Sequence, residues 1–529
     1  MRIQLPIAAL AACTLVLTAR TLAQGEDPAQ RPALGSVDDE LPSVAALHAW
    51  AKRSAAKKGG APAPADLPQP YLDLDYDGYR ALRAKRSTRL WDGTAARFRA
   101  EPLHLGGHYQ IPVRVSVIGR DGKMRPYGFR SEAFDLPEGL KPLPEGSGFA
   151  GLRFLSCERR LGAFDEFLVF HGASYFRAVG RCHGFGTSAR GLAIDTAQPS
   201  GEEFPSFTRF LLEEPEPGTQ ALVLHGLMES KSATGVFRFE VTPGLETVMD
   251  VDAVLYPRRA LEQVGIAPLT SMFLFAPRRG RRVDDFRGAV HDADGLAIIT
   301  GSGERLWRPL SNPKSLQVSA FVDQSPRGFG LIQRSRDAGS FGDLEAEYER
   351  RPSVWVEPLE PWGKGAVVLV EIPTETEFND NVVAFWRPEV PLAAGVPARF
   401  RYRLRFADGA PDEADVSRVV CTGEGRAVGA LAESTARVFA VDFLGAESLR
   451  GVPLGELELD AWASAGTLEE TRLERLHGGG VRAVLRFEPG PDVRAADLSA
   501  ALRTKGKGEG EGMDWMGVVS ERWMTRWQR

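Results

Sequence analysis

Short segments of alternating hydrophobic and polar residues dominate the chain and predict a protein built almost entirely of β-strands. In each segment β-branched or aromatic residues gather between glycine, proline or aspartate, which is typical of strands that end in turns. Leu457, Leu459 and Ala461, for example, alternate with acidic residues as in a half-buried strand. We expect further strands at 109–117, 166–171, 221–226, 236–241, 366–372, 381–386, 399–405 and 481–487.

One amphipathic helix is expected before the first strand. Ser43 is a good N-cap, and Val44, Leu47 and Trp50 follow it at helical spacing. The stretch APAPADLPQP at 61–70 is rich in proline and predicts an extended connector between this helix and the strands.

A polar, turn-rich stretch at 407–414 predicts a boundary between two β-domains. The half-buried strands that follow it are spaced by turns, as in an immunoglobulin-like sandwich. The predicted organisation is therefore a signal peptide at 1–23, a helix and connector at 24–70, a large β-sandwich at 71–406, a linker at 407–414 and an Ig-like domain at 415–529.

The first residues read as a targeting segment. Arg2 precedes an apolar stretch that reaches Ala19, and small residues follow up to Ala23. This pattern is typical of a secretory signal peptide, and we expect Sec export with cleavage near Ala23. Cys13 sits in a stretch that looks like a lipoprotein box, but the apolar run continues past it. No later apolar run reaches 18 residues, so no membrane-spanning helix is expected.

Charge and cysteine content exclude some classes of protein. Lys and Arg number 65 and Asp and Glu number 70, a net charge of −5, whereas nucleic-acid-binding domains are strongly basic. After the predicted cleavage Cys157, Cys182 and Cys421 remain, an odd count that does not make a disulfide framework. A single Cys157–Cys182 bond stays open, and buried free thiols are the favoured interpretation.

Several motifs that resemble known sites lack an essential part. Asp73, Asp75 and Asp77 match the first half of a calcium-binding loop, but Ala84 stands where the bidentate Glu belongs. We expect an acidic helix start there. Ser188 lies in GTSARG, which is not a nucleophile elbow. The motifs of zinc proteases, P-loops and dinucleotide-binding loops are missing, so neither a metal nor an organic cofactor is expected.

Two acidic stretches are candidates for chemistry. One surrounds Asp292 and Asp294, and the other runs from Glu371 to Asn381. Acidic turns before strands are usually only solvated, but a pair of carboxyl groups is also what glycoside hydrolysis requires. Aromatic residues near them can stack on sugar rings or pack in a core: Trp307, Tyr348, Trp355, Trp362 and Trp386.

Longer strings show a specific resemblance. GASYFR at 172–177, SARGLAIDT at 188–196 and APLTSMFLF at 267–275 resemble the periplasmic glucan biosynthesis proteins G and D. The strings PSGEEFP, WRPL, RGFGL, WGKG and VEIPT extend the likeness over most of the chain. The resemblance implies a large mutarotase-like supersandwich followed by an Ig-like domain, an all-β fold. It also implies a periplasmic role in making or trimming osmoregulated β-1,2-glucans.

The same resemblance implies specific roles. Asp380 corresponds to the family's general acid and Asp292 to its general base, while Tyr348 and Glu377 correspond to substrate or proton-path residues. A polymer substrate needs a long cleft, and Trp355 and Trp386 are further candidates for stacking on its sugar rings. Phe378, Glu347 and Thr187 depart from the family strings. Phe378 and Glu347 flank the expected proton path. They leave open whether water or a sugar hydroxyl accepts the cleaved glucan chain.

Three functions remain open at this point. The first is an inverting endo-β-1,2-glucanase, and the second is a transglycosylase or cyclase of the same glucan. The third is a non-catalytic glucan-binding partner of an inner-membrane glucosyltransferase, which two intact carboxyl residues make less favoured. The expected partners are β-1,2-glucan and this glucosyltransferase. A homodimer remains open, and the sequence gives no glucan chain length.

Overall fold

The computed structural model describes residues 41, 43–57, 60–160, 163–277, 284–411, 414–426, 435–505 and 517–529. The predicted signal peptide at 1–23, with Cys13, lies outside the described residues. Within them strands dominate and most pairs are antiparallel, which confirms the predicted all-β sandwich class. The described part holds no helix long and apolar enough to cross a membrane.

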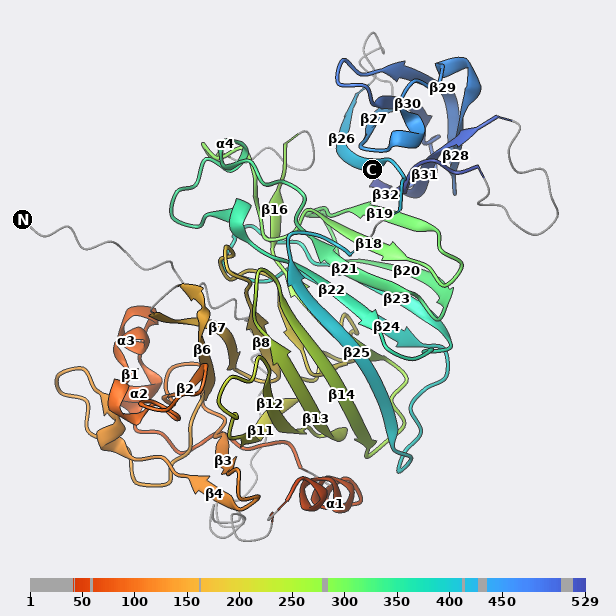
Figure 1. Cartoon of the computed structure of the whole chain (residues 1–529). Helices are drawn as coiled ribbons and strands as arrows, with labels where there is room; N and C mark the ends of the chain where they lie inside the picture. Colours follow the sequence, from red (N-terminus) through yellow and green to blue (C-terminus); the bar gives the residue numbers. More distant parts are fainter. Residues whose placement is uncertain are drawn as a thin grey trace, which may run out of the picture.

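Two large sheets make the body of the molecule (Figure 1). The 10-stranded sheet contains, in spatial order, β2 (Phe98–Leu103), β6 (Gly151–Arg160), β7 (Ala163–His171), β8 (Tyr175–Ala178), β9 (Ser188–Arg190), β15 (Val264–Ser271), β24 (Val382–Pro388), β23 (Lys364–Glu371) and β20 (Gln317–Gln324), with β10 (Ala193–Ile194) paired to β15.

The 14-stranded sheet is continuous from one end of the molecule to the other. Its order is β28 (Leu457–Ala463), β31 (Ala495–Thr504), β32 (Arg522–Gln528), β19 (Arg305–Pro309), β18 (Gly295–Ile299), β21 (Gly328–Ile332), β22 (Ser353–Pro358), β25 (Ala398–Ala407), β14 (Thr247–Pro257), β13 (Ala233–Thr242), β12 (Leu222–Glu229), β11 (Ser206–Glu213), β3 (Arg114–Ile118) and β4 (Met124–Tyr127).

Smaller elements complete the fold. The four-stranded sheet comprises β26 (Arg418–Arg426), β27 (Arg437–Leu444), β30 (Val481–Glu488) and β29 (Thr467–Arg475), and the two short pairs are β1 (Arg83–Ala84) with β5 (Phe134–Asp135) and β16 (Phe273–Phe275) with β17 (Val290–His291). The α-helices of the described residues are α1 (Val44–Ala55), α2 (Gln69–Leu72), α3 (Tyr76–Ala81) and α4 (Ala338–Phe341). The short 3-10 turn η5 (Tyr348–Arg350) precedes β22.

The main core lies between the two large sheets and is rich in phenylalanine. Phe170 of β7, for example, meets Phe239 of β13 with ring centroids 5.1 Å apart. Side chains of β6 to β9, β15 and β24 fill one side of this core, and side chains of β11 to β14 and β25 fill the other. Burying this apolar surface is the main stabilising contribution.

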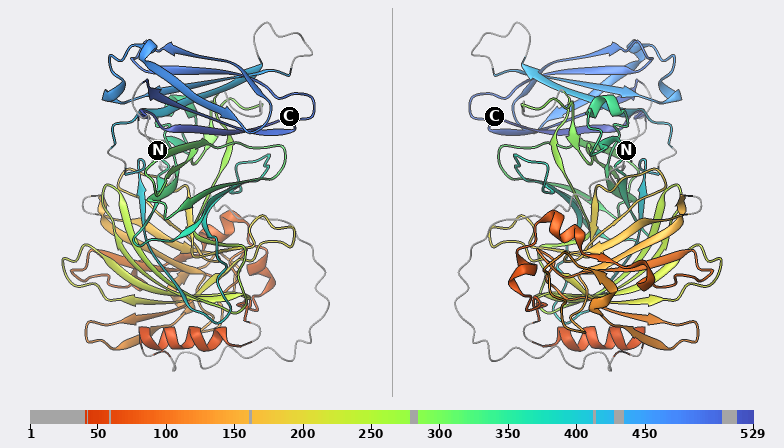
Figure 2. Two further views of the ribbon diagram at one scale, coloured as in Figure 1. Left: turned by 90° about the vertical axis from the view of Figure 1, so that its right-hand side faces the viewer. Right: turned by 90° about the vertical axis from the view of Figure 1, so that its left-hand side faces the viewer.

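The strands after the predicted linker form a layer at one end of the molecule (Figure 2). The predicted boundary at 407–414 falls between β25 and β26. However, β32 pairs in parallel with β19, so β28, β31 and β32 extend the large sheet. A second core joins both parts and includes Trp307 and Trp355 together with Phe439 and Trp523. The division into two domains stays a prediction.

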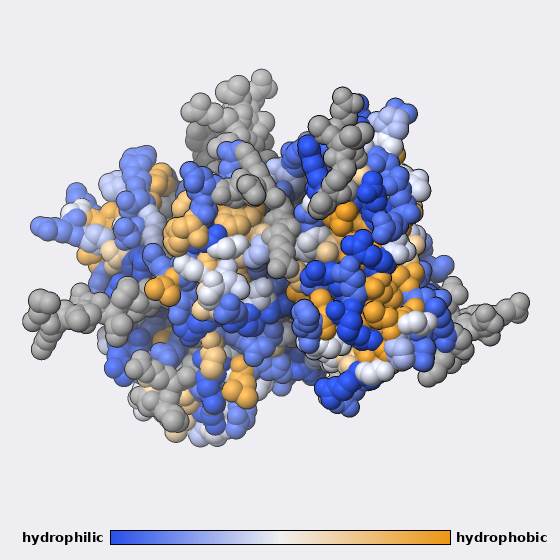
Figure 3. All heavy atoms as spheres, turned by 90° about the horizontal axis from the view of Figure 1, so that it is seen from above, coloured by the Kyte–Doolittle hydropathy of each residue, from blue (hydrophilic) through white to orange (hydrophobic). Residues whose placement is uncertain are grey.

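In the end-on view of Figure 3, hydrophobic patches lie among hydrophilic side chains.

Local predictions made at the level of single residues can also be compared with the structure. Ser43 caps α1 by accepting the N–H of Ala46 at 3.2 Å, as predicted. Asp75 caps α3 by accepting the N–H of Gly78 at 2.8 Å, so this acidic stretch starts a helix as expected. The three described cysteines are free, but Cys182 is exposed and Cys157 and Cys421 are half-buried, so the predicted burial is wrong. Cys157 lies on β6 and Cys421 on β26, whereas Cys182 lies in the loop after β8.

The helix α1 covers part of the outer face of the large sheet. Leu47 and Ala51 are buried there, and the Thr234 hydroxyl donates to the Ala51 carbonyl at 2.9 Å. Their apolar neighbours on the sheet are Leu211, Leu227, Val236 and Tyr256.

Leu47→Ala should therefore lower the free energy of unfolding by about 2–5 kcal/mol, because it leaves a cavity under α1. Lys52→Ala, on the exposed face of the same helix, should change it by less than about 0.5 kcal/mol. Denaturant titration followed by circular dichroism measures both. Equal effects would mean that α1 does not contribute through this contact.

Candidate active site

Asp380 is fixed by the residue that follows it. It lies just before β24, and its side chain is 3% exposed. The amide of Asn381 accepts the N–H of Phe273 at 2.8 Å and donates to the carbonyls of Phe273 and Ile372, both at 3.0 Å. These three bonds join the ends of β16, β23 and β24. The backbone at Asp380 is therefore held by side-chain bonds on its C-terminal side.

Asp292 occupies a similar position at the end of β17. It is 6% exposed, and its N–H donates to the Met272 carbonyl at 2.9 Å. Burial raises the pKa of its carboxyl group, whereas the positive charges of Arg351 and Arg177 lower it. The Arg351 guanidinium lies 3.7 Å from the Asp292 carboxylate. Asp292 is thus a buried acid whose proton affinity depends on charged neighbours.

Arg177 connects the two acidic residues. It belongs to β8, and its Nε donates to the hydroxyl of Ser188 on β9 at 2.5 Å. Its Nη2 lies 3.9 Å from a carboxylate oxygen of Asp380, and its charge also acts on Asp292. Arg177 is therefore an ion-pair neighbour of Asp380, and its charge also acts on Asp292.

Tyr348 is the third predicted residue in this group. It begins η5 and is 3% exposed, packed against Phe341 with ring centroids 5.9 Å apart. The Arg351 guanidinium carbon lies 5.2 Å from the centre of the Tyr348 ring. Burial raises the pKa of the Tyr348 hydroxyl, and the charges of Asp292 and Glu377 raise it further. Tyr348 and Asp292 thus share Arg351 as a neighbour.

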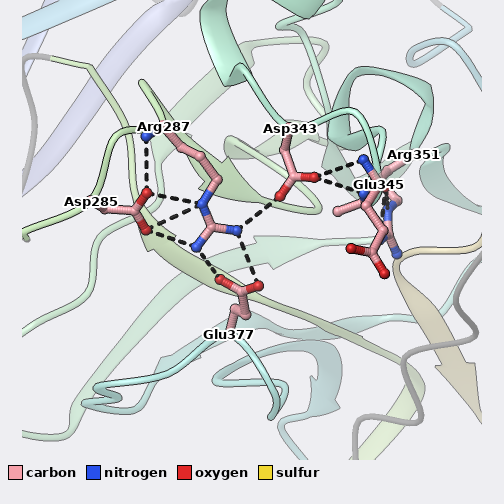
Figure 4. Close-up of polar contacts among 7 residues, drawn as sticks. Asp285, Arg287, Asp343, Glu345, Arg351 and Glu377 are labelled. Atoms are coloured by element: carbon pink, nitrogen blue, oxygen red, sulfur yellow. Dashed lines mark hydrogen bonds and ion pairs between the residues drawn. The ribbon is translucent and has the colours of Figure 1, made fainter.

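Glu377 is held by an arginine that also binds two other acids (Figure 4). Arg287 donates to both oxygens of Glu377 at 3.1 and 2.5 Å. The same guanidinium donates to Asp343 at 2.9 Å and to Asp285 at 2.7 Å. Arg287 therefore fixes Glu377 and ties three loops together at the edge of the site. We call these four residues the Arg287 cluster.

Trp355 and Trp386 are not brought to this site. Trp355 is 2% exposed, and a Cβ built on Gly328 would lie 2.3 Å from its ring. Trp386 is fully buried, and a Cβ on Gly365 would lie 2.5 Å from its ring. Each indole thus fills the space that a strand glycine leaves open. Both residues serve as core packing, and neither presents a ring to a sugar in this structure.

The surrounding arginines had no assigned role in the sequence. Arg177 lies within GASYFR and Arg351 lies three residues after Tyr348, so both were close to recognised strings. On the other side of Asp380, Tyr175 of β8 pairs with Arg190 of β9. Burial raises the pKa of Tyr175 to about 12, the Arg190 charge opposes this shift, and the Asp380 charge adds to it. The strand pairing that assembles these residues is long-range, and no local pattern reveals it.

Among the described residues, no group of three or more His, Cys, Asp and Glu side chains has the arrangement of a metal site. What the arrangement does provide is two buried carboxyl groups with different surroundings, a phenol and a fixed glutamate. Two carboxyl groups in unlike surroundings can serve as acid and base in one reaction.

Comparisons with known proteins identify the family of this chain. The sequence profile described as "Periplasmic glucan biosynthesis protein, MdoG" matches residues 43–527. Glucans biosynthesis protein G of Vibrio cholerae serotype O1 is 44% identical over 444 residues, which cover 82% of this chain and 79% of that protein. The protein of the same name from Rhodopseudomonas palustris is 41% identical over 504 residues, or 95% of this chain and 96% of the relative. The chain therefore belongs to the periplasmic glucan biosynthesis protein family MdoG.

Proposed function

We propose that this protein acts in periplasmic glucan biosynthesis as an inverting endo-β-1,2-glucanase. Relatives with high identity are named glucans biosynthesis protein G, which supports the periplasmic setting and the glucan as substrate class. The observation that carries the catalytic part is the pair of buried carboxyl groups, each beside a guanidinium: Asp292 lies 3.7 Å from Arg351 and Asp380 lies 3.9 Å from Arg177. A protein that only binds glucan has no need to bury two carboxyl groups, because each buried charge has a desolvation cost.

In the proposed reaction Asp380 donates a proton to the departing glycosidic oxygen. Asp292 accepts a proton from the attacking water, directly or through a relay of water and sugar hydroxyls. Burial raises the pKa of Asp292 and makes it a stronger base than an exposed aspartate, which favours proton transfer near neutral pH. Tyr348 and Glu377 would orient the water or the sugar beside Asp292. Asp380 is assigned as the acid because the family resemblance implies this role for the Asp within Asn379–Asn381.

Transglycosylation is the second candidate, and the low exposure of both carboxyl groups favours it. Asp292 is 6% and Asp380 is 3% exposed, so a bound glucan would leave little room for bulk water. Product analysis on linear β-1,2-glucan separates the two reactions. New reducing ends indicate hydrolysis, and cyclic or branched products without new reducing ends indicate transfer. Unchanged glucan would leave the binding role, with the membrane glucosyltransferase as partner.

The proposed acid and base can be tested by substitution. Asp380→Asn and Asp292→Asn should each lower the rate of glucan cleavage by about 10²–10⁴-fold, because an amide cannot perform the proton transfer. Size analysis of the glucan products measures this loss. A nitrophenyl glucooligosaccharide separates the roles, because its leaving group needs little protonation. Asp380→Asn should regain activity on this substrate and Asp292→Asn should not. The reverse result would exchange the two roles.

Asp294 offers a matched control two residues from Asp292. Its Oδ2 accepts the N–H groups of Arg334 and Ser335 at 2.9 and 2.8 Å. The amide oxygen of Asp294→Asn can accept both bonds, so this variant should keep most of the activity. Equal loss at Asp292 and Asp294 would mean that the acidic turn is only structural.

The next prediction concerns the acid limb of the pH profile of kcat/KM. The base works only when ionised, and its raised pKa places this limb above the ordinary aspartate value of 3.8. Glu377→Gln removes a negative charge that raises the Asp292 pKa, so the limb should move to lower pH. Arg351→Gln removes a positive charge that lowers this pKa, so the limb should move to higher pH. Shifts in the same direction for both variants would exclude Asp292 as the titrating base.

A further inference from the structure

A buried ion pair joins the last strands of the chain to the body of the molecule. Glu521 directly precedes β32 and is 6% exposed. Its carboxylate accepts two bonds from Arg334 at 2.5 and 2.8 Å and the N–H of Val419 at 2.8 Å. The Arg334 guanidinium also lies 3.5 Å from the centre of the Trp307 ring. Bidentate geometry of this kind fixes orientation as well as distance.

Arg334 belongs to a four-residue stretch after β21, which we call the 333–336 segment. Its first residue, Gln333, is fully buried. The Gln333 side-chain amide donates to the His291 carbonyl at 3.2 Å and to the Tyr348 carbonyl at 3.0 Å. A single amide thus bridges the residue that precedes Asp292 and Tyr348, which shares Arg351 as a neighbour with Asp292.

The rest of the 333–336 segment contacts the same two neighbours. The N–H groups of Arg334 and Ser335 bind the Asp294 carboxylate, which lies on the strand connection after Asp292. Arg336 donates to the carbonyls of Glu349 and Arg351 at 2.9 and 2.5 Å, on the turn that carries Tyr348. The segment therefore sets the distance between the Asp292 connection and the Tyr348–Arg351 turn.

Packing on the side of the ion pair is incomplete. A cavity of about 260 Å³ lies against Arg334 and Glu521, between β18, β22 and β26, and Ile332, Trp355 and Asp408 contribute to its wall. Arg334 is the residue of the 333–336 segment that lines this cavity, so apolar contacts do not fully enclose Arg334 on this side. Its position there depends on polar contacts, among which the Glu521 pair comes from the far end of the chain.

We propose that Glu521 is a positioning residue for the reaction assigned to Asp292 and Asp380. Its ion pair with Arg334 holds the 333–336 segment, and this segment fixes Asp292 relative to Tyr348 and Arg351. The last strands of the chain thus take part in activity without touching the substrate. The kinetic part of this inference rests on the proposed function, whereas its structural part does not.

A matched pair of variants tests the structural part. Glu521→Gln removes the carboxylate from the Arg334 pair. Glu304→Gln removes a carboxylate from a second ion pair between β32 and the body of the molecule. In this pair Arg522 Nε lies 2.5 Å from Glu304. Glu304 has no contact with the 333–336 segment among the hydrogen bonds and ion pairs of the described residues.

Hydrogen–deuterium exchange on the full-length chain without glucan measures the result. Glu521→Gln should speed exchange in peptides that cover 290–296, 332–336 and 347–352, whereas Glu304→Gln should leave these peptides at the wild-type rate. Unchanged exchange in Glu521→Gln, or equal acceleration by both variants, would overturn the proposal. Neither result depends on whether the protein cleaves glucan, so failure here is distinct from failure of the proposed function.

Kinetics on linear β-1,2-glucan test the second part. Misplacement of reacting groups by about 1 Å can cost about 10²-fold in rate, so Glu521→Gln should lower kcat by up to this factor with little change in KM. Water that enters the loosened turn should lower the Asp292 pKa and move the acid limb of kcat/KM to lower pH. The charges of Arg351, Arg177 and Glu377 face this carboxyl group and remain unchanged.

Two further comparisons separate positioning from loss of folded protein. A smaller folded fraction lowers kcat/KM by the same factor at every pH and leaves the acid limb at its wild-type pH. Such a uniform loss in Glu521→Gln, without a shift of the acid limb, would contradict the proposal. Glu521→Asp keeps the carboxylate and should recover part of kcat and return the limb toward its wild-type pH. Glu304→Gln should show wild-type kinetics.

Discussion

Charges that are buried between two apolar sheets must find partners, and this requirement organises the molecule. Arg308 and Glu371 meet at 2.9 Å although they are 63 positions apart, and Arg190 of β9 meets Glu202 in the loop before β11 at 2.7 Å. Such pairs add little net stability, but breaking one leaves an uncompensated charge, so they select one arrangement of the chain. They act as fixed points around which the loops at the strand ends are built.

The proposed site follows the same requirement with looser spacing. Arg177 lies 3.9 Å from Asp380 and Arg351 lies 3.7 Å from Asp292, about 1 Å farther than in the structural pairs. At these separations each guanidinium group compensates the negative charge of its carboxylate but does not form a short hydrogen bond to it. A carboxyl group that must gain or lose a proton is better served by this spacing than by a tight bidentate pair. Glu377, in contrast, is held bidentately by Arg287, in keeping with a residue that orients other groups.

Strands and helix starts were largely predictable because they depend on neighbours in the sequence. The alternating segment at 236–241 lies within β13, and the cap at Ser43 is present. The joining of β32 to β19 was not predictable, because local alternation does not say which edges will pair. The role of the tryptophans was also missed. Trp355 and Trp386 were expected near a sugar, but the partners that explain them are glycines on neighbouring strands, and this complementarity exists only in three dimensions.

Asp292, Asp380, Tyr348 and Glu377 were identified through strings shared with a family, and the structure places them in one neighbourhood. Their arginine partners were not identified, since Arg177 lies 380 − 177 = 203 positions from Asp380. The contact between Arg334 and Glu521 likewise spans 187 positions. Contacts of this range close large loops, and the entropy lost in closing them slows folding. The 10-stranded sheet carries Arg177 and the strand ends that hold Asp380, whereas β18 and β21 of the 14-stranded sheet flank the connection that carries Asp292. The proposed activity would therefore report that both sheets have assembled.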